Sequence, residues 1–370
     1  MVSQTGATIA DLDTPIIVVD IAAVERNISQ LFTRLRKFGG VSVRPHLKTG
    51  KCAEIARMLI AGGAQGICVA KLSEAEVFTD AGIEDILITT EIVGRTKLAR
   101  LLKLHARNPK LRIVVDNLAV ARDLNALPRE MNSATEPIQV LIDLNVGQNR
   151  TGVDSVQLAL SVARGVAELP HLKLIGVQGY EGHLQHLADV ERQEKCRAAM
   201  ATLSEAVKLL RSNGLDVPVV TTGGTGTAEI CADGENITEV QPGSFIFMDV
   251  AYRNATNGKY SNALSVLATV ISKPAPDRAV VDAGLKCLSV DMGFAEPKNM
   301  PNLTYRPAGD EHGIVEHKTA GGYVPLNVGD KIELLPGHID TTVALFDQYH
   351  IMRGGMLEAV WTIAARGKVQ

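Results

Sequence analysis

The 370-residue sequence has no excess of basic residues, no CxxC pair and few aromatic side chains. Its 38 Lys and Arg are balanced by 41 Asp and Glu, and a net charge of −3 offers no basic surface to nucleic acid or to an anionic membrane. The five cysteines are scattered along the chain, which argues against a disulfide framework and against a thiolate metal site. We therefore expect reduced thiols, no nucleic acid partner and no membrane partner.

Apolar runs that could cross a membrane are also missing, because none approaches the roughly 18 residues that a span requires. Residues 1–15 carry neither a basic region nor an apolar stretch, so we expect no secretory signal. Together these features predict a cytoplasmic protein. The 46% hydrophobic and 21% charged residues are typical of a soluble globular chain and argue against disorder.

Short β-branched runs alternate with amphipathic stretches from residue 15 onward, which is the pattern of repeated βα units and a parallel sheet. The runs expected to form strands are 15–20, 41–47, 66–71, 85–90, 111–117, 138–145, 172–182 and 219–224. Eight strands with intervening helices in about 230 residues match a (β/α)8 TIM-type barrel, whose catalytic groups lie at the carboxyl ends of the strands. A doubly wound open sheet is the alternative.

After residue 255 the sequence changes to short β-like pieces separated by glycine and proline, which predicts a second, mainly β domain. The turn-rich segment 253–258 marks the connection. We therefore expect a barrel over residues 15–252 and a β-rich domain over 253–370, with segment 1–14 attached to the second domain.

Lys48 is the first candidate for chemistry, because it lies in the segment RPHLK directly after the second expected strand. A lysine there is either an ordinary surface residue or a Schiff-base lysine. In the second case its pKa is lowered by burial or by a nearby cation such as Arg44 or Lys51.

Two glycine-containing segments, TTGGTG at 221–226 and PGS at 242–244, are the second candidate. Both are compatible with simple turns. In a barrel, however, the loops after strands seven and eight commonly hold a phosphate with backbone N–H groups. The glycines that would bring amides close to a phosphate are Gly223, Gly224, Gly226 and Gly243. No GxxxxGK[ST] motif occurs, which argues against a nucleotide P-loop.

Polar side chains also follow the sixth and seventh expected strands. GQNRTG directs Arg150 toward the same end of the barrel, and GYEGHLQH delivers Tyr180, His183 and His186. A single histidine is usually a satisfied polar neighbour. Two histidines and a tyrosine at one strand end favour a functional role.

In the second domain, LPGHID places His338 and Asp340 two residues apart. On a strand these side chains would share one face, which is the minimum geometry for two ligands on one metal ion. An imidazole and a carboxylate suit manganese, magnesium or cobalt better than a structural zinc site. A lysine, a phosphate cradle, an arginine, histidines and a metal pair together indicate pyridoxal phosphate (PLP) as cofactor.

The motifs in their order resemble the D-threonine aldolase family. They are RPHLKTGKC, AGIEDILITTEIVG, NVGQNRTGV, GYEGH with QH, TTGGTGT, QPGSFIFMD, SKPAPDRAVVDAGLK, DEHG, PGHID and the final ARG. The wider group includes D-serine dehydratases and D-3-hydroxyaspartate enzymes, all PLP enzymes of the alanine-racemase-like fold type III. The similarity runs from about Thr14 to Gly367.

The resemblance implies that Lys48 forms the Schiff base and that His186 corresponds to the histidine proposed as base. The other cofactor-binding residues that it implies are Arg150 at the ring oxygen, Tyr180, Gly224, Thr225, Gly243 and Ser244 around the phosphate, and Tyr252 beside the cofactor. His338 and Asp340 would hold a divalent metal ion, most simply Mn²⁺, with Mg²⁺ or Co²⁺ as alternatives.

The implied activity is retro-aldol cleavage of small D-3-hydroxy amino acids, with D-threonine giving glycine and acetaldehyde and D-phenylserine-type substrates giving an aromatic aldehyde. Dehydratases of the group tend to carry Cys where this chain has Asp340, so Asp340 favours the aldolase. Ala70, Ala251 and Arg253 depart from the pattern of many relatives, whereas His183 differs from some aldolases and resembles several dehydratases. A metal-dependent dehydratase giving an oxo acid and ammonia is the nearest alternative, and a non-catalytic PLP carrier is the second. The resemblance also implies a homodimer.

Overall fold

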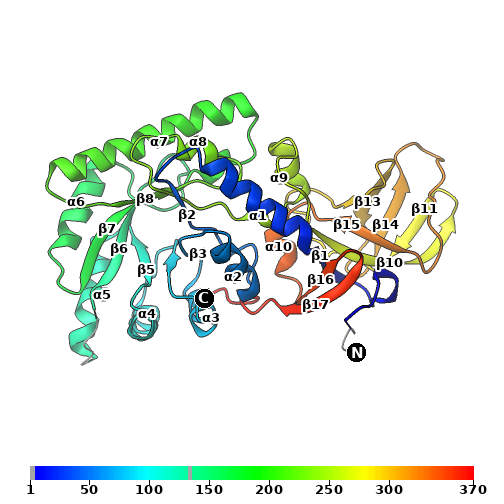
Figure 1. The fold of residues 1–370 in the computed structure, drawn as a ribbon, viewed down its shortest axis with the longest axis horizontal. Coiled ribbons are helices and arrows are strands. Elements are labelled where there is room, and N and C mark those ends of the chain that lie inside the picture. Colours follow the sequence, from blue (N-terminus) through cyan, green and yellow to red (C-terminus); the bar gives the residue numbers. More distant parts are fainter. Residues whose placement is uncertain (1–4, 132–135) are drawn as a thin grey trace. The chain divides into compact units, whose positions relative to one another are not determined.

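The computed structural model describes residues 5–131 and 136–370, and the chain divides into two compact units (Figure 1). The barrel unit comprises Leu31–Gly243 and Lys368–Gln370, and the β unit comprises Met1–Gln30 and Ser244–Gly367. Of the N-terminal segment expected to join the β domain, residues 1–4 lie outside the described residues. No helix within the described ranges is long and apolar enough to cross a membrane.

The barrel unit contains a parallel sheet of eight strands within the part of the chain that the structure describes. Its order is β2, β9, β8, β7, β6, β5, β4, β3. The bounds are β2 (Ser42–Val43), β3 (Ile67–Val69), β4 (Ile86–Ile88), β5 (Arg112–Val115), β6 (Ile138–Asp143), β7 (Leu172–Gly179), β8 (Val219–Thr222) and β9 (Glu239–Val240). Just beyond β2, a parallel bridge joins His46 to Cys68 of β3, so the two edges of the sheet meet. This is the expected barrel.

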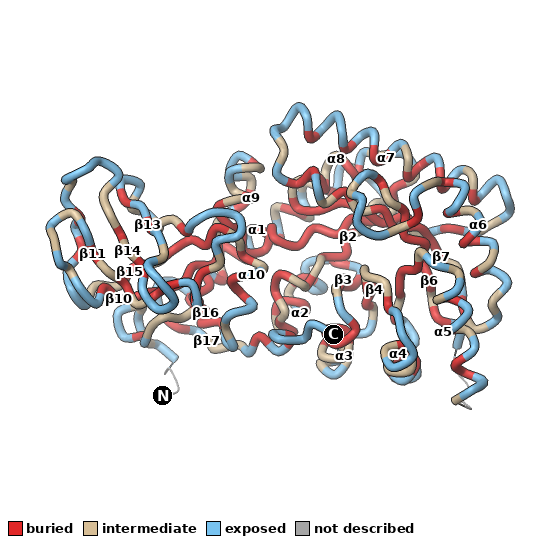
Figure 2. The backbone as a smooth tube through the Cα atoms, turned by 180° about the vertical axis from the view of Figure 1, so that it is seen from behind, coloured by how far each residue is buried: buried red, intermediate tan, exposed pale blue. Residues whose placement is uncertain are grey.

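Helices follow the strands of the barrel unit, as the alternating pattern predicted. They are α2 (Ala53–Ala61), α3 (Leu72–Asp80), α4 (Arg95–Arg107), α5 (Leu118–Glu130), α6 (Val156–Ala167), α7 (Asp189–Ser212) and α8 (Ala228–Ala232), and α1 (Ile21–Leu35) spans the point at which the units divide. In α4, for example, Leu98, Leu101 and Leu102 are buried at helical spacing. The strands themselves are buried along most of their length (Figure 2).

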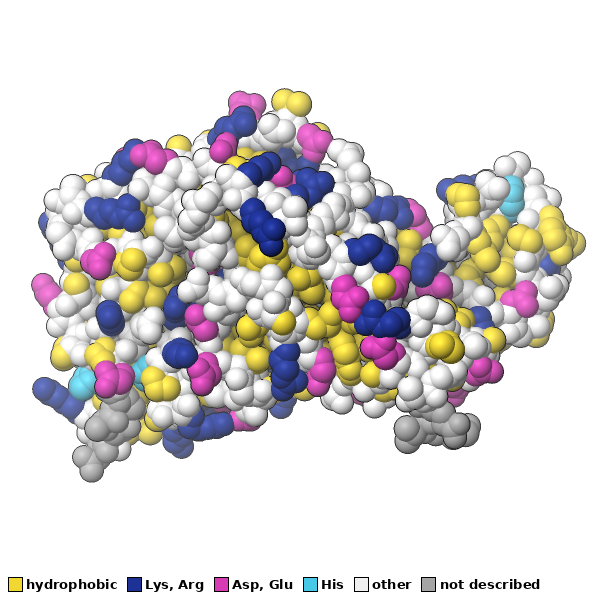
Figure 3. All heavy atoms as spheres, in the orientation of Figure 1, with side chains coloured by type: hydrophobic (Ala, Val, Ile, Leu, Met, Phe, Trp, Pro, Cys, Tyr) yellow, Lys and Arg dark blue, Asp and Glu magenta, His cyan; other side chains and the backbone are white. Residues whose placement is uncertain are grey.

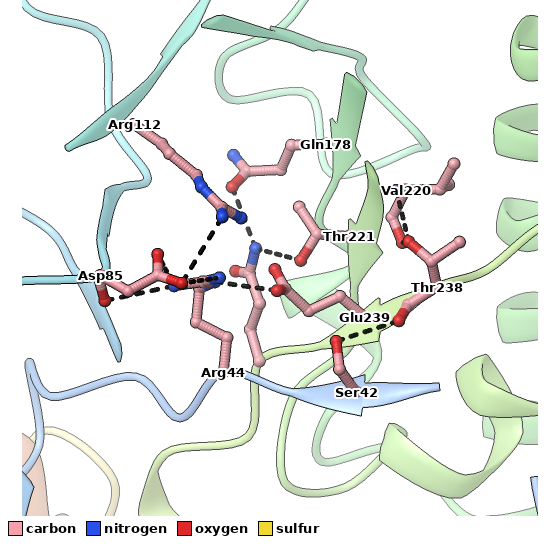
Figure 4. Close-up of polar contacts among 10 residues, drawn as sticks. Ser42, Arg44, Asp85, Arg112, Gln178, Val220, Thr221, Thr238 and Glu239 are labelled. Atoms are coloured by element: carbon pink, nitrogen blue, oxygen red, sulfur yellow. Dashed lines mark hydrogen bonds and ion pairs between the residues drawn. The ribbon is translucent and has the colours of Figure 1, made fainter. Parts of the chain in front are cut away.

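An ion cluster around the buried Arg44 includes Asp85, Arg112 and Glu239, which lie at the amino-terminal ends of β4, β5 and β9 (Figure 4). Arg44 is fully buried, and its Nε donates to Glu239 Oε2 at 2.8 Å while a terminal nitrogen donates to Asp85 Oδ1 at 2.7 Å. Arg112 also approaches Asp85, at 3.5 Å. Residues at this end of a barrel serve stability more often than catalysis. The Arg44 guanidinium, suggested as a cation near Lys48, is thus held by these carboxylates.

The β unit contains a nine-stranded sheet among the residues described. Its main path is β13, β14, β11, β10, β1, β16, β17, with β15 paired to β10 and β12 paired to β15. The bounds are β1 (Ile16–Asp20), β10 (Leu264–Ala275), β11 (Arg278–Val281), β12 (Glu296–Pro297), β13 (Leu303–Pro307), β14 (Gly313–His317), β15 (Lys331–Leu335), β16 (Gln348–Arg353) and β17 (Met356–Thr362). Short helices complete the unit: α9 (Val250–Ala255) and α10 (Ile339–Val343).

The first expected barrel strand, 15–20, forms a strand in the other sheet. As β1 it pairs antiparallel with β10 and parallel with β16, so its assignment to the barrel is wrong. The eighth barrel strand is instead β9, which pairs with β2 and β8 and has only two residues. The division between the units accordingly differs from the expected limits of 15–252 and 253–370.

The surface carries charges of both signs. On the face drawn in Figure 3, basic and acidic side chains are interspersed, in keeping with the net charge of −3.

Candidate active site

Lys48, Tyr180 and Arg150 come together at the carboxyl ends of barrel strands. Lys48 lies in the turn after β2, Tyr180 follows β7, and Arg150 lies in the loop after β6. The Lys48 Nζ is 6.0 Å from the centroid of the Tyr180 ring, and the Arg150 Cζ is 5.8 Å from the same centroid. These contacts place an amine and a guanidinium around one aromatic ring, at the end of a barrel where catalytic groups lie.

His46 supports this group and was not singled out from the sequence. Its Nδ1 accepts a hydrogen bond from the Lys48 backbone amide (3.2 Å), and its Nε2 lies 2.9 Å from Thr89 Oγ1. Burial lowers the pKa of His46 well below its ordinary value, and the positive charges of Lys48, Lys51 and Arg150 lower it further. The ring is therefore neutral, with its hydrogen on Nε2, and it anchors the turn that carries Lys48. The sequence signal that could have revealed His46 is its position two residues before Lys48.

The loop that carries Arg150 is held by its own side chains. Asn145 Oδ1 accepts from the backbone amides of Gly147 and Asn149, each at 3.0 Å. Gly152 has a φ of +92°, and a Cβ there would lie 2.6 Å from the Asn145 backbone nitrogen. Glycine is therefore required at position 152 for the loop to close back on itself. Arg150 is itself exposed.

A carboxyl pair, Glu91 and Asp143, lies at the ends of β4 and β6, near Arg150. Asp143 is buried and accepts from Gln178 Nε2 (2.9 Å) and Thr151 Oγ1 (3.1 Å). Burial, the charge of Asp143 and a hydrogen bond to it raise the pKa of Glu91 to about 8. Glu91 is thus protonated at neutral pH and donates to the Asp143 carboxylate.

The raised pKa of Glu91 predicts a pH-dependent contribution to stability. Because the folded chain holds this proton up to about pH 8 and the unfolded chain releases it near its ordinary value of 4.5, stability falls as pH rises between those values. The Glu91→Gln side chain still donates a hydrogen bond but does not titrate. The loss of stability between pH 5 and pH 8 should therefore be smaller in this variant, and its stability at pH 8 should exceed that of the wild type. Urea unfolding at pH 5 and pH 8, at fixed cofactor concentration, measures the free energy of unfolding at each pH. The exposed Glu168→Gln is the control, and an equal slope in both variants would contradict the assignment.

The glycine loop, residues 222–227, begins at the last residue of β8, and residues 241–243 follow β9. Once β1 is removed from the barrel, these are the loops after its seventh and eighth strands, as the phosphate-site rule requires. The backbone amides of Gly223, Gly224 and Gly226 nevertheless donate to the side chains of Glu181, Thr227 and Gln185. Three of the four glycine amides expected near a phosphate are therefore engaged by the chain itself, and they hold the loop in shape. Thr225, between the last two glycines, is buried.

Gly243 allows residues 241–243 to approach the Lys48 segment closely. A Cβ there would lie 2.8 Å from the His46 backbone oxygen, and the His46 amide donates to Pro242 O at 3.1 Å. Ser244 and Tyr252 belong to the β unit, where both are buried. Asp249 caps α9 through the Tyr252 amide, at 2.7 Å.

His338 and Asp340 lie at the start of α10, so their expected placement on a strand is wrong. His338 is the extended N-cap residue and Asp340 lies in the first helical turn. His338 Nδ1 is 2.6 Å from Asp291 Oδ2, and Thr341 Oγ1 donates to the other Asp291 oxygen at 3.0 Å. Since Asp291 engages Nδ1, a metal ion would bind through Nε2, the usual arrangement of a carboxylate behind a ligating histidine. Asp291 is a functional candidate that the sequence did not reveal, because it lies 47 residues from His338.

The histidines after β7 are both exposed. His183 lies against Gly147 of the Arg150 loop, since a Cβ at Gly147 would be 3.5 Å from its ring. His186 lies in the turn after η2 (Gly182–Leu184).

Lys51, suggested as a cation near Lys48, forms an ion pair with Glu74.

Two domain families match the chain. The alanine racemase N-terminal domain matches residues 19–251, and a "serine dehydratase domain" matches residues 263–352. The D-threonine aldolase of Arthrobacter sp is 41% identical, with 99% of this chain and 96% of that protein covered. The D-threo-3-hydroxyaspartate dehydratase of Delftia sp. is 32% identical, with 96% and 98% covered. The crystal structure of D-threonine aldolase from Filomicrobium marinum superimposes with a TM-score of 0.94 at 35% identity, and all of both chains is covered.

The barrel, the β domain and the group formed by Lys48, Tyr180 and Arg150 together define an enzyme of the alanine-racemase-like fold. This fold implies PLP as cofactor. More particularly, the chain belongs to the D-threonine aldolase family. The resemblance and the fold class predicted from the sequence are thereby confirmed.

The residues present fit both implied groups. An amine, a guanidinium and an aromatic ring converge at the barrel mouth, with two loops of close backbone approach beside them, as a phosphorylated aldehyde requires. In the β unit, an imidazole backed by a carboxylate and a second carboxylate two residues away form a donor set that suits a divalent ion of intermediate or hard character.

Proposed function

We propose that this protein is a carbon–carbon lyase that cleaves D-3-hydroxy amino acids, D-threonine among them, into glycine and an aldehyde, with PLP and a divalent metal ion. The observation that carries the proposal is the convergence of Lys48, Tyr180 and Arg150 in a chain that also carries Asp340 beside His338. PLP supplies the electron sink for the bond that breaks.

Each residue has a defined part in this proposal. The Lys48 amine would hold the cofactor covalently, through a link that the substrate amine can replace. Arg150 and Tyr180 orient the cofactor, together with Gly224, Thr225, Gly243, Ser244 and Tyr252. His186 accepts the proton of the substrate β-hydroxyl. The electrons of the Cα–Cβ bond remain on the glycine fragment, which takes up one proton, so D-threonine yields one glycine and one acetaldehyde.

The metal ion would be held by His338 Nε2 and an Asp340 oxygen. Mn²⁺ is the ion we propose, with Mg²⁺ or Co²⁺ as alternatives. Bound there, it would lower the pKa of the substrate hydroxyl, as a metal lowers that of bound water. We also propose a homodimer, for which sedimentation should give twice the chain mass of 39.6 kDa.

Product analysis tests the proposal. D-threonine is incubated with the enzyme, PLP and Mn²⁺, and glycine, acetaldehyde, ammonia and oxo acid are assayed together, with L-threonine as the control substrate. We expect glycine and acetaldehyde in equal amounts from the D-isomer alone. Ammonia and oxo acid in their place would assign a dehydratase, in line with the similarity to the Delftia enzyme. Bound PLP without any turnover would assign a carrier.

A further inference from the structure

Glu181 is a fully buried acidic residue that the proposed chemistry does not use. It follows Tyr180 and directly precedes η2. Burying a carboxylate is unfavourable unless hydrogen bonds satisfy its oxygens. The partners of Glu181 therefore indicate why the residue lies there.

Those partners come mainly from the glycine loop. Glu181 Oε2 accepts from Thr222 Oγ1 at 2.9 Å and from the Gly223 amide at 3.2 Å. Glu181 Oε1 accepts from Thr227 Oγ1 and, at 3.2 Å, from Gln185 Nε2. Both ends of the loop are thus bound to one carboxylate, and charged acceptors make the stronger hydrogen bonds.

The charge of Glu181 also decides the direction of the next hydrogen bonds. An ionised carboxylate only accepts, so the Thr227 hydroxyl donates its one hydrogen to Glu181. Its lone pairs then accept from the Gly224 amide and from Gln185 Nε2, each at 2.9 Å. Gln185 Oε1 in turn accepts from the Gly226 amide, at 2.8 Å.

The close fit of this loop requires glycine at position 226. A Cβ there would lie 2.6 Å from the backbone oxygen of Gln185, which no side-chain movement relieves. Thr225 lies between the two glycines whose amides are held by Thr227 and Gln185. The conformation of the loop around Thr225 is therefore set by hydrogen bonds that depend on Glu181.

A metal site is the other interpretation of this cluster, because Glu181, Cys196 and Cys231 have potential ligand atoms within 4.8 Å of one another. Thiols bind metal as thiolates, whereas burial raises the pKa of Cys231 well above its ordinary value. Cys231 Sγ instead donates toward Glu181 Oε1 at 3.5 Å. A metal ion would also have to displace Thr227 and Gln185 from the same oxygen. The contacts favour a hydrogen-bonded anion.

We propose that Glu181 is a positioning residue that holds the glycine loop in the conformation that receives the cofactor phosphate. The inference rests on the proposed use of PLP. Glu181 acts through Thr227 and Gln185 and does not itself touch the cofactor. Because the loop is ordered before the phosphate arrives, binding does not have to supply the free energy of ordering it.

Glu181→Gln tests the proposal. The variant side chain has nearly the same shape, but its NH₂ group is a donor and would face groups that already donate to Glu181. The full chain is stripped of cofactor and titrated by absorbance with PLP and with pyridoxal, which lacks the phosphate. We expect the Kd for PLP to rise about tenfold to hundredfold, the loss that follows from breaking charge-assisted hydrogen bonds, while the Kd for pyridoxal is unchanged. The exposed Glu205→Gln of α7 is the matched control.

A second pair of variants covers the case in which Glu181→Gln does not fold. Thr227→Ser retains the hydroxyl that links Glu181 to the Gly224 amide, whereas Thr227→Val removes it with little change of volume. We expect Thr227→Val to lose the preference for PLP over pyridoxal and Thr227→Ser to keep it.

The outcomes separate this inference from the proposed function. Equal losses for PLP and pyridoxal, or no loss for either, would contradict the role of Glu181, as would equal behaviour of the two Thr227 variants. A bound metal ion in the purified chain that disappears in Cys196→Ser would also overturn it. A wild-type chain that binds no PLP would contradict the proposed function as well. A wild-type chain that binds PLP beside a Glu181→Gln variant that keeps its preference contradicts the inference alone.

Discussion

Replacing Lys48 with alanine is expected to abolish the visible absorbance of the bound cofactor and to lower kcat/KM for D-threonine by at least about 10³-fold, the scale of loss when a covalent catalytic group is removed. The physical reason is positional. The Lys48 Nζ is the amine beside the Tyr180 ring and Arg150 at the barrel mouth. Its turn is anchored by His46, whose ring accepts the Lys48 backbone hydrogen bond.

The control for this variant is Lys103→Ala, an exposed lysine of α4 in the same unit, which should retain both absorbance and activity. Circular dichroism and thermal unfolding show whether Lys48→Ala keeps the fold. Full activity in Lys48→Ala would refute the assignment of the cofactor to this residue. Loss of activity with unaltered absorbance would place the covalent link elsewhere.

Removal of the metal ion is the second large effect that we expect. Chelation should stop aldehyde release, and added Mn²⁺ should restore it in the wild type but not in His338→Ala, with kcat/KM reduced by about 10²-fold or more. The His338 ring is oriented by Asp291, and truncation removes the only imidazole of the His338 and Asp340 pair. Titration of Mn²⁺ into the chain, followed by electron paramagnetic resonance, measures the binding directly.

His312→Ala is the matched control, because His312 is an exposed histidine of the same unit. It should bind Mn²⁺ and respond to chelator as the wild type does. An enzyme that is indifferent to chelator would contradict the metal's part in the reaction while leaving the Lys48 prediction intact.

Strand 15–20 shows where prediction from local pattern ends. Its β-branched run correctly predicted a strand, yet β1 pairs with β10 and β16 in the β unit. Pairing partners are decided by contacts far apart in the chain, and here the partners begin more than 240 residues away, as Ile16 opposite Leu267 illustrates. Conversely, Glu239–Val240 completes the barrel with two residues, too few to show any periodicity.

The candidate site was predicted unevenly for the same reason. Lys48, Arg150 and Tyr180 follow recognisable strands, and parallel strands deliver such residues to one end of a barrel. His338 and Asp340 were expected on a strand, but the segment enters α10 with His338 as N-cap. The acceptors of the glycine-loop amides were missed, since nothing in the spacing of Glu181 and Gln185 reveals that they are buried against residues 222–227.

The sequence by itself determined the alternation of strands and helices, the barrel followed by a β domain, the family and the residue types available for chemistry, because periodicity, turn composition and motif order are local properties of the chain. The tertiary structure alone decided that β1 joins the sheet of the β unit and that Arg44 pairs with Glu239 and Asp85. It also decided that Glu181 forms hydrogen bonds with the glycine loop. The reason is that pairing, burial and the protonation of a buried group depend on neighbours that only folding brings together.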